Sequence, residues 1–153
     1  MKLNTNSKSL VKVQAHLVAE CFNKLFIGGQ FVDPIDGEKL PTYYPATGEL
    51  LHEFPRGKAN DVEDAIAAAE IAWAEGTWAG MTAAERAKVV AKMAQGIEDN
   101  VEMLAEIEAA DVGKPFRQAA MTLGGAAGEG KYWCSLGAAL DAEQDVPVNS
   151  GGG

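Results

Sequence analysis

Cysteine and histidine side chains can act as a nucleophile, a base or a metal ligand, and the chain has four such residues: Cys21, Cys134, His16 and His52. A thiolate can attack a carbonyl carbon, and an imidazole can accept the proton that the thiol loses. The four residues are scattered, and their spacing matches neither a zinc-ligand motif nor a nucleophile elbow. Cys134 also lies in a Tyr-Trp-Cys-Ser stretch of a predicted helix, where a thiol packs as a small apolar group. We therefore expect both thiols to be inert and expect no catalytic residue in this chain.

Three weaker candidates for a binding site come from glycine, lysine and tryptophan residues. The glycines between positions 124 and 130 follow no predicted strand and have neither GxGxxG nor GxxxxGK[ST] spacing, which excludes a phosphate loop. Lys114 lies near a predicted helix end, where its charge favours the helix dipole. Trp73 lies on the apolar face of a predicted helix, which favours core packing over a binding box. The sequence therefore predicts no cofactor-binding residue.

The composition is that of a globular protein with an acidic balance. The chain has 153 residues, of which 47% are apolar, and a formal net charge of −9 at pH 7. This length suits one domain with its own core. The negative charge argues against nucleic acid and anionic membranes as partners, and no apolar run approaches the ~20 residues of a membrane span. Two lone cysteines suit a reducing compartment, so we expect a cytoplasmic protein.

The first third of the chain is predicted to hold an extension and a small β unit. Residues 1–24 are expected to form a poorly anchored N-terminal extension, with apolar side chains spaced as in a short amphipathic helix. Residues 25–56 are predicted to form antiparallel β-hairpins. Gly28-Gly29 between apolar pairs is typical of a two-residue hairpin turn, and residues 36–37 and 45–48 predict further turns. A β unit this small must pack on helices or on something outside the chain.

The rest of the chain has helical periodicity. Helices are predicted over about 60–75, 82–97, 99–110 and 116–141, followed by a flexible tail over 141–153. Asn60 is the expected N-cap of the first helix, and Thr82 with Glu85 forms a capping box for the second. Gly76 and Gly113 are expected to end the first and third helices. Each glycine inside the last helix costs ~1 kcal/mol relative to alanine, so we expect this helix to need a closely packed partner.

Five segments occur in an order that matches a known family. They are LFIGGQFV at 25–32, YPATGELL at 44–51, an alanine-rich helix at 60–74, WAGMTAAER at 78–86 and ADVGKPF at 110–116. Together they resemble the N-terminal portion of the aldehyde dehydrogenase superfamily, over about residues 25–140. The WxxMT stretch within them is most similar to the branch that acts on betaine aldehyde and aminoaldehydes.

The resemblance implies an α/β enzyme that oxidises an aldehyde to a carboxylic acid with NAD or NADP. In that family a cysteine attacks the aldehyde, hydride passes to the nicotinamide, and a glutamate activates the water that hydrolyses the thioester. None of these parts matches a segment of this chain, so we expect it neither to bind NAD(P) alone nor to oxidise aldehydes.

The resemblance also implies one candidate metal ligand. Asp111 matches an aspartate that in many members helps to bind a structural monovalent cation. Lys39 aligns where many members carry threonine or serine, and Tyr44 replaces the usual asparagine before the proline of the 45–48 turn. Asp111 is thus either a cation ligand or the cap of a helix end or turn.

Two functions remain open at this point. The first is the N-terminal part of an NAD(P)-dependent aldehyde dehydrogenase, not catalytically competent as this chain, whose partner is the missing remainder of the enzyme or a second copy. The second is a non-enzymatic helical interaction or oligomerisation module derived from that enzyme. In both cases the expected fold is that of an α/β family, mostly α-helical here with a short N-terminal antiparallel β-hairpin region.

Overall fold

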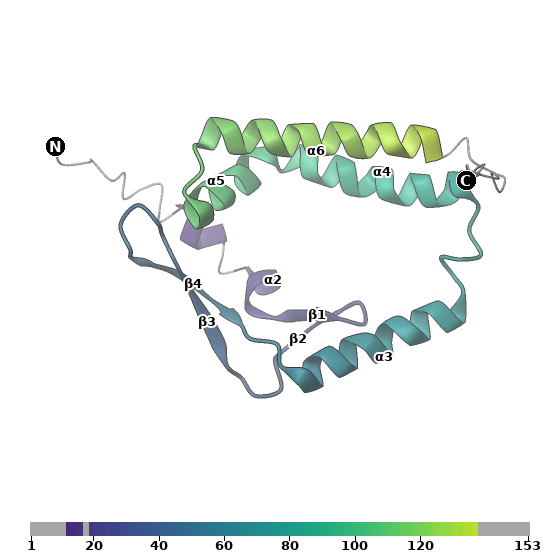
Figure 1. The fold of residues 1–153 in the computed structure, drawn as a ribbon, viewed down its shortest axis with the longest axis horizontal. Helices are drawn as coiled ribbons and strands as arrows, with labels where there is room; N and C mark the ends of the chain where they lie inside the picture. The colour runs from purple at the N-terminus through teal and green to yellow at the C-terminus, as the bar shows by residue number, and fades with distance from the viewer. Residues whose placement is uncertain (1–11, 17–18, 138–153) are drawn as a thin grey trace, which may run out of the picture.

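The computed structural model describes residues 12–16 and 19–137, whose elements surround a central opening (Figure 1). Helices make up most of this part of the chain, and the strands form two small antiparallel sheets. The predicted fold class is therefore confirmed. No helix in the described ranges is long and apolar enough to cross a membrane. The expected tail over 141–153 and most of the expected extension lie outside the described residues.

The strands form two hairpins whose turns depend on glycine. β1 (Leu25–Ile27) pairs with β2 (Gln30–Val32), and both turn glycines have positive φ, 59° at Gly28 and 78° at Gly29. β3 (Lys39–Tyr43) pairs with β4 (Leu50–Pro55). β3 lies within the predicted hairpin range, 25–56, and has a proline at its centre. A two-stranded sheet tolerates this proline, since each strand has an unpaired edge.

The helices begin and end at local signals, with one correction. α2 (Glu20–Asn23) is a single turn before the first hairpin. α3 (Ala59–Glu75) has Lys58 as its N-cap rather than Asn60, because the carboxylate of Asp61 accepts a hydrogen bond from the Lys58 amide at 2.8 Å. α4 (Ala83–Asp99) has the predicted capping box: the Thr82 amide donates to the Glu85 carboxylate and the Glu85 amide donates to the Thr82 hydroxyl.

The last two helices pack closely through small side chains. α5 (Val101–Val112) ends at Gly113, with φ 73°, and α6 (Phe116–Gly137) runs along α4 and α5. The buried residues in these three helices are all alanines: Ala94, Ala105, Ala110, Ala119 and Ala127. A Cβ added at Gly130 would lie 3.1 Å from the Ala94 Cβ, so this glycine permits the close approach of α6 to α4. The remaining expected helical residues, 138–141, lie outside the described part.

The N-terminal segment (residues 12–16) is helical and belongs to the core. Val13 and Leu51 are each 3% exposed and form a cluster with Ala110 of α5. The Gln14 side-chain amide donates to the Leu50 carbonyl of β4 at 3.2 Å. The expectation of a poorly anchored extension is therefore wrong for these residues, because an apolar side chain and an amide fasten them to β4 and α5.

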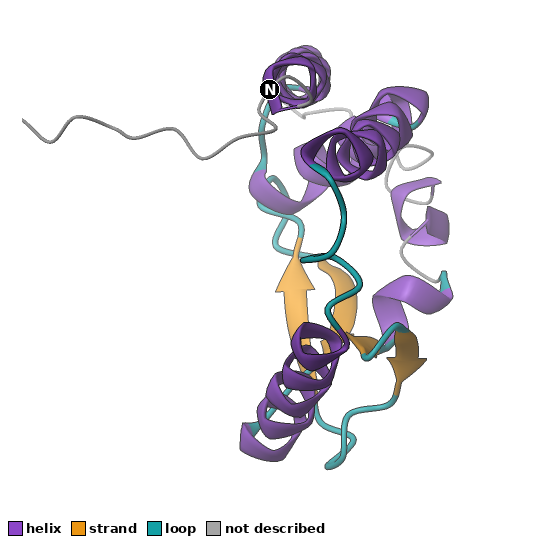
Figure 2. Cartoon of the chain, turned by 90° about the vertical axis from the view of Figure 1, so that its right-hand side faces the viewer, coloured by secondary structure: helices purple, strands orange, loops and turns teal. Residues whose placement is uncertain are grey.

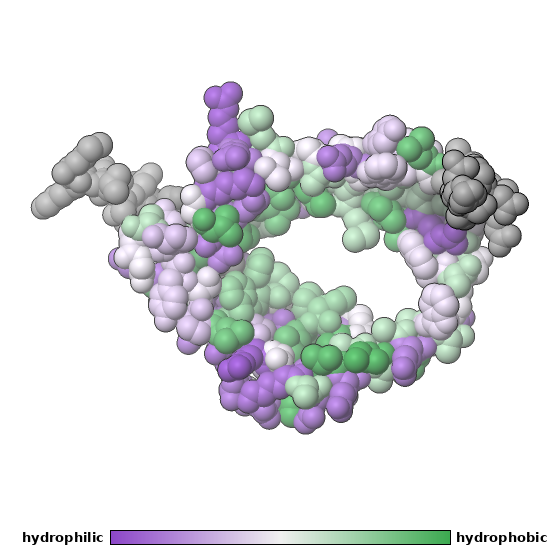
Figure 3. Space-filling view, viewed as in Figure 1, coloured by the Kyte–Doolittle hydropathy of each residue, from purple (hydrophilic) through white to green (hydrophobic). Residues whose placement is uncertain are grey.

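α3 lies apart from α4, α5 and α6 in both views (Figures 1 and 2). It packs against β1, but its apolar side chains remain largely exposed: Val62 is 53%, Ile66 is 55% and Trp73 is 79% exposed. Figure 3 shows hydrophobic residues along α3 and along the opposite helices where both border the opening. The prediction that Trp73 packs in the core is wrong within the described structure, because no described element covers that face of α3.

Candidate functional site

The predicted cation ligand, Asp111, lies in the last turn of α5 and faces β3. Its carboxylate oxygen Oδ1 accepts a hydrogen bond of 2.8 Å from the Thr42 hydroxyl, at the surface of the molecule. A carboxylate beside a hydroxyl is a pair of hard oxygen donors, the type that suits hard cations. The same hydrogen bond also ties the end of α5 to β3. Asp111 therefore joins two elements whether or not a cation is bound.

The hydroxyl beside Asp111 belongs to Thr42, whereas the sequence comparison placed Lys39 at this position. Lys39 lies three residues earlier in β3, where it pairs with Pro55. Three residues of strand span about 10 Å and end on the opposite face. The irregular pairing at Thr42 and Tyr43 accompanies the approach of Thr42 to α5.

The two thiols lie in different surroundings. Cys21 is exposed in α2, and Cys134 is half-buried in α6. Cys134 lines a cavity of about 380 Å³ with apolar residues and Arg86, whose guanidinium donates to the Met81 carbonyl. Among the described residues, neither thiol has a hydrogen bond to a histidine or carboxylate, and no three acidic, histidine or cysteine side chains gather as a metal site. Neither thiol is placed as a general-base-activated nucleophile.

Lys114 and the glycines of α6 have structural positions. The Lys114 ammonium donates to the Glu108 carboxylate at 2.7 Å and to the Thr122 hydroxyl at 3.0 Å, so it bridges α5 and α6. The glycines between 124 and 130 lie inside a continuous helix rather than in a loop at a helix N-terminus. Their amides are therefore not arranged to cradle a phosphate.

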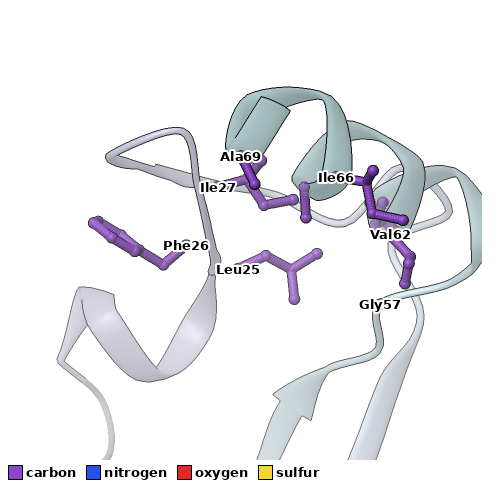
Figure 4. Close-up of a pocket in the computed structure, with 9 residues that line it drawn as sticks. Leu25, Phe26, Ile27, Gly57, Val62, Ile66 and Ala69 are labelled. Atoms are coloured by element: carbon purple, nitrogen blue, oxygen red, sulfur yellow. The ribbon is translucent and has the colours of Figure 1, made fainter. Parts of the chain in front are cut away.

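An apolar groove runs between the first hairpin and α3 (Figure 4). Its volume is about 400 Å³. Leu25 points toward Gly57 and α3, whereas the Phe26 ring points away from them (Figure 4). The other apolar side chains of the lining come from β1 and from one face of α3: Ile27, Val62, Ala65, Ile66 and Ala69.

Among the described residues that line this groove, Asp61 alone is charged, and its carboxylate oxygens already accept hydrogen bonds. It is 4% exposed and accepts hydrogen bonds from the Lys58 amide at 2.8 Å and the Ile35 amide at 3.0 Å. These bonds to the charged form hold the pKa of the Asp61 carboxyl below its ordinary value. Asp61 thus fixes the start of α3 to the loop after β2, and its charge is directed at the chain's own backbone.

The lining of this groove lacks the groups that bind the phosphates of a dinucleotide. The pyrophosphate of NAD needs free backbone amides at a helix N-terminus or basic side chains. The groove presents apolar side chains and one carboxylate, which accepts hydrogen bonds from the Lys58 amide at the start of α3 and from the Ile35 amide in the loop after β2. The geometry suits the burial of an apolar surface, and no step of nicotinamide chemistry follows from it.

The sequence analysis did not select Thr42 or Asp61 as site residues. For Asp61 a usable signal existed, because the third position of a helix commonly holds an acidic residue that accepts a hydrogen bond from the cap amide. The Thr42 contact depends on how β3 meets α5, which local sequence does not encode.

The chain is similar to known proteins of one family. The model of the aldehyde dehydrogenase family matches residues 31–152. Aldehyde dehydrogenase family 2 member C4 of Arabidopsis thaliana is 44% identical over 96 residues, which cover 63% of this chain and 19% of that protein. The chloroplastic betaine aldehyde dehydrogenase of Amaranthus hypochondriacus is 36% identical over 128 residues, which cover 82% of this chain and 26% of that protein.

The fold is also that of the corresponding part of solved structures. A double mutant of betaine aldehyde dehydrogenase from Staphylococcus aureus, solved in complex with NAD+, superposes with a TM-score of 0.81 at 25% identity. The match covers 92% of this chain and 28% of that chain. The chain therefore spans roughly a fifth to a quarter of the length of the relatives that it matches.

Proposed function

Because the chain belongs to the aldehyde dehydrogenase family, we propose that it is the N-terminal part of an NAD(P)-dependent aldehyde dehydrogenase and supplies structure rather than chemistry. The observation that carries this proposal is α3, a helix with a well-bonded N-terminus whose apolar side chains are more than half exposed. Amphipathic helices gain most of their stability by burying that face. The groove beside α3 thus provides a surface on which the rest of such an enzyme packs.

The substrate of the intact enzyme is proposed to be an aldehyde of the betaine aldehyde or aminoaldehyde class. The 36% identity to the Amaranthus enzyme over most of this chain supports this class. The lone thiols favour the cytoplasm, although that relative is named as chloroplastic.

Aldehyde oxidation by the purified chain tests the lack of independent chemistry. With betaine aldehyde and either NAD or NADP, we expect no reduced cofactor above the rate of the protein-free blank. Cys134→Ala and Cys21→Ala serve as matched variants and should give the same result as the unaltered chain. Production of reduced cofactor that disappears in either variant would show that the chain carries its own nucleophile.

The second candidate is an interaction or oligomerisation module, and the exposure of Val62, Ile66 and Trp73 on α3 favours it. In this case the exposed face of α3 contacts another protein chain, a second copy included. Sedimentation at micromolar concentration should then show a dimer or larger species that Ile66→Lys converts to monomer. A chain that is monomeric before the substitution contradicts self-association.

The pair formed by Thr42 and Asp111 is proposed to bind a monovalent cation weakly. Two oxygen donors of suitable type lie at one exposed point, which fits such an ion. A melting temperature measured in sodium or potassium chloride should exceed that in choline chloride of equal ionic strength. The difference should vanish in Asp111→Asn; equal melting temperatures in all salts contradict the proposal.

A further inference from the structure

The Glu106 carboxylate on α5 is held between two side chains of the N-terminal segment. The Lys12 ammonium lies 2.5 Å from Oε1, and the His16 imidazole nitrogen Nε2 lies 3.6 Å from Oε2. Lys12 and His16 are four residues apart, so they lie on the same side of one helical turn. The two oxygens of one carboxylate therefore face two different basic side chains.

Only one of the two contacts is a hydrogen bond. Lys12 and Glu106 form a hydrogen bond between opposite charges. His16 Nε2 and Glu106 Oε2 are both shielded from solvent, and neither has a hydrogen-bond partner among the described residues. Shielded polar atoms without a partner are costly. A proton on Nε2 would let the imidazole donate to Oε2 and would place a positive charge beside the carboxylate.

The same segment is fastened to the core on its other side. Val13 packs with Leu51 and Ala110, and Gln14 donates to the Leu50 carbonyl. None of these contacts involves a group that titrates near neutral pH. These contacts hold the segment to the same extent at every pH, whereas the strength of the His16–Glu106 contact depends on whether the imidazole is protonated.

We propose that Lys12, His16 and Glu106 form a pH-sensitive clasp that fastens the N-terminal segment to α5. A histidine is ordinarily protonated below about pH 6.5, and a glutamate is ordinarily charged above about pH 4.3. With a proton on Nε2 the clasp has two ion pairs, and with a neutral imidazole only Lys12 holds the carboxylate. The segment is therefore held more tightly at mildly acidic pH than at pH 7.5.

Other charged groups border the same place. His16 and Lys12 line a cavity of about 350 Å³ with acidic side chains from the end of α4 and the start of α5: Glu98, Asp99 and Glu102. Glu98 is paired with Lys131 of α6. β4, which also packs on the segment, carries His52 and Glu53, and the His52 ring contacts Phe54 edge-on.

Amide hydrogen exchange of the full chain tests the clasp at its own position. Exchange of residues 12–16 is measured at pH 5.5 and 7.5 and corrected for the intrinsic pH dependence of exchange. We expect corrected exchange to be about threefold or more slower at pH 5.5, roughly the effect of one partly exposed ion pair. Equal corrected rates at the two pH values would overturn the proposal.

Three substitutions assign the effect. His16→Gln should remove the pH dependence, because it keeps a polar side chain that does not titrate. Lys12→Gln should speed exchange at both pH values and retain the dependence. His52→Gln, the matched control at the only other histidine, should also retain it. A dependence that survives His16→Gln, or that disappears only in His52→Gln, contradicts the assignment.

Discussion

Helices with well-formed ends occur on both sides of the molecule, but the two sides differ in how their side chains are buried. On one side, which we call the packed side, α4, α5 and α6 bury alanines against one another and the N-terminal segment lies on β4 and α5. On the other side, the α3 arm (Ala59–Glu75) has a bonded N-terminus, a glycine end with φ 68°, and exposed isoleucine, valine and tryptophan. Local signals therefore define the helix ends on both sides, but most of the buried helical side chains lie on the packed side.

This difference shows where the chain's stability and its interactions reside. Small side chains allow helices to approach closely, and the packed side buries five alanines in α4, α5 and α6. The same helices also expose large apolar side chains, with Met93 66%, Met121 69% and Trp133 64% exposed. Large apolar side chains on α3 have only β1 and a groove beside them. Within the described residues, the apolar face of the α3 arm therefore has little of the chain's own structure to cover it.

The largest effect should come from truncating the core of the packed side. Leu51→Ala removes a side chain that is 3% exposed, and it should lower the free energy of unfolding by ~2–4 kcal/mol. Ile66→Ala on the α3 arm is the matched change and should cost no more than ~0.5 kcal/mol, since that side chain is already more than half exposed. Urea denaturation of both variants provides the values. Equal losses would contradict the contrast between the two sides.

A smaller effect is expected at the helix caps. Thr82→Ala removes the hydroxyl that accepts the Glu85 amide and should cost ~1 kcal/mol. Asn60→Ala should change stability by less than ~0.5 kcal/mol, because Asn60 is not the cap of α3. Thermal unfolding of the two variants compares them directly. A larger loss of stability in Asn60→Ala than in Thr82→Ala would indicate that Asn60 is the N-cap of α3.

The caps show how much the sequence could predict. The turns at residues 28–29 and 36–37, the Thr82–Glu85 box and the glycine ends of α3 and α5 are encoded by neighbouring residues, so local patterns indicated them. The position of Thr42 beside Asp111, the burial of Val13 and the exposure of Trp73 depend on which elements meet in space. Local periodicity marks an apolar face but does not show whether another element covers it.

Substitutions of two glycines in α6 should distinguish a glycine that permits close helix packing from one that only weakens the helix. Gly124→Ala meets nothing within 4 Å and should stabilise the chain by ~0.5–1 kcal/mol. At Gly130 the new Cβ would lie 3.1 Å from Ala94, so Gly130→Ala should gain less or destabilise. Chemical denaturation monitored by circular dichroism measures both changes. A larger gain at Gly130 would mean that α4 and α6 are not in tight contact there.

A pH effect of modest size should appear at the start of α3. The pKa of Asp61 is lowered in the folded chain, so its contribution to stability is complete above its unfolded value, near 3.9, and is lost as the pH falls further. Asp61→Asn should therefore melt at a lower temperature than the unaltered chain at pH 7. The difference in melting temperature between the two proteins should be smaller at pH 3. A gap that stays constant across this range would show that the charge of Asp61 does not stabilise α3.

A thermal melt with and without NAD tests the central claim, that this chain provides structure without a cofactor site. Near-UV circular dichroism follows its three tryptophans. A ligand that binds the folded chain at a hundred times its Kd adds about 2.7 kcal/mol of stability, which is readily seen as a rise in Tm. The account predicts the same melting curve with and without millimolar NAD. A rise in Tm that increases with NAD concentration would contradict it.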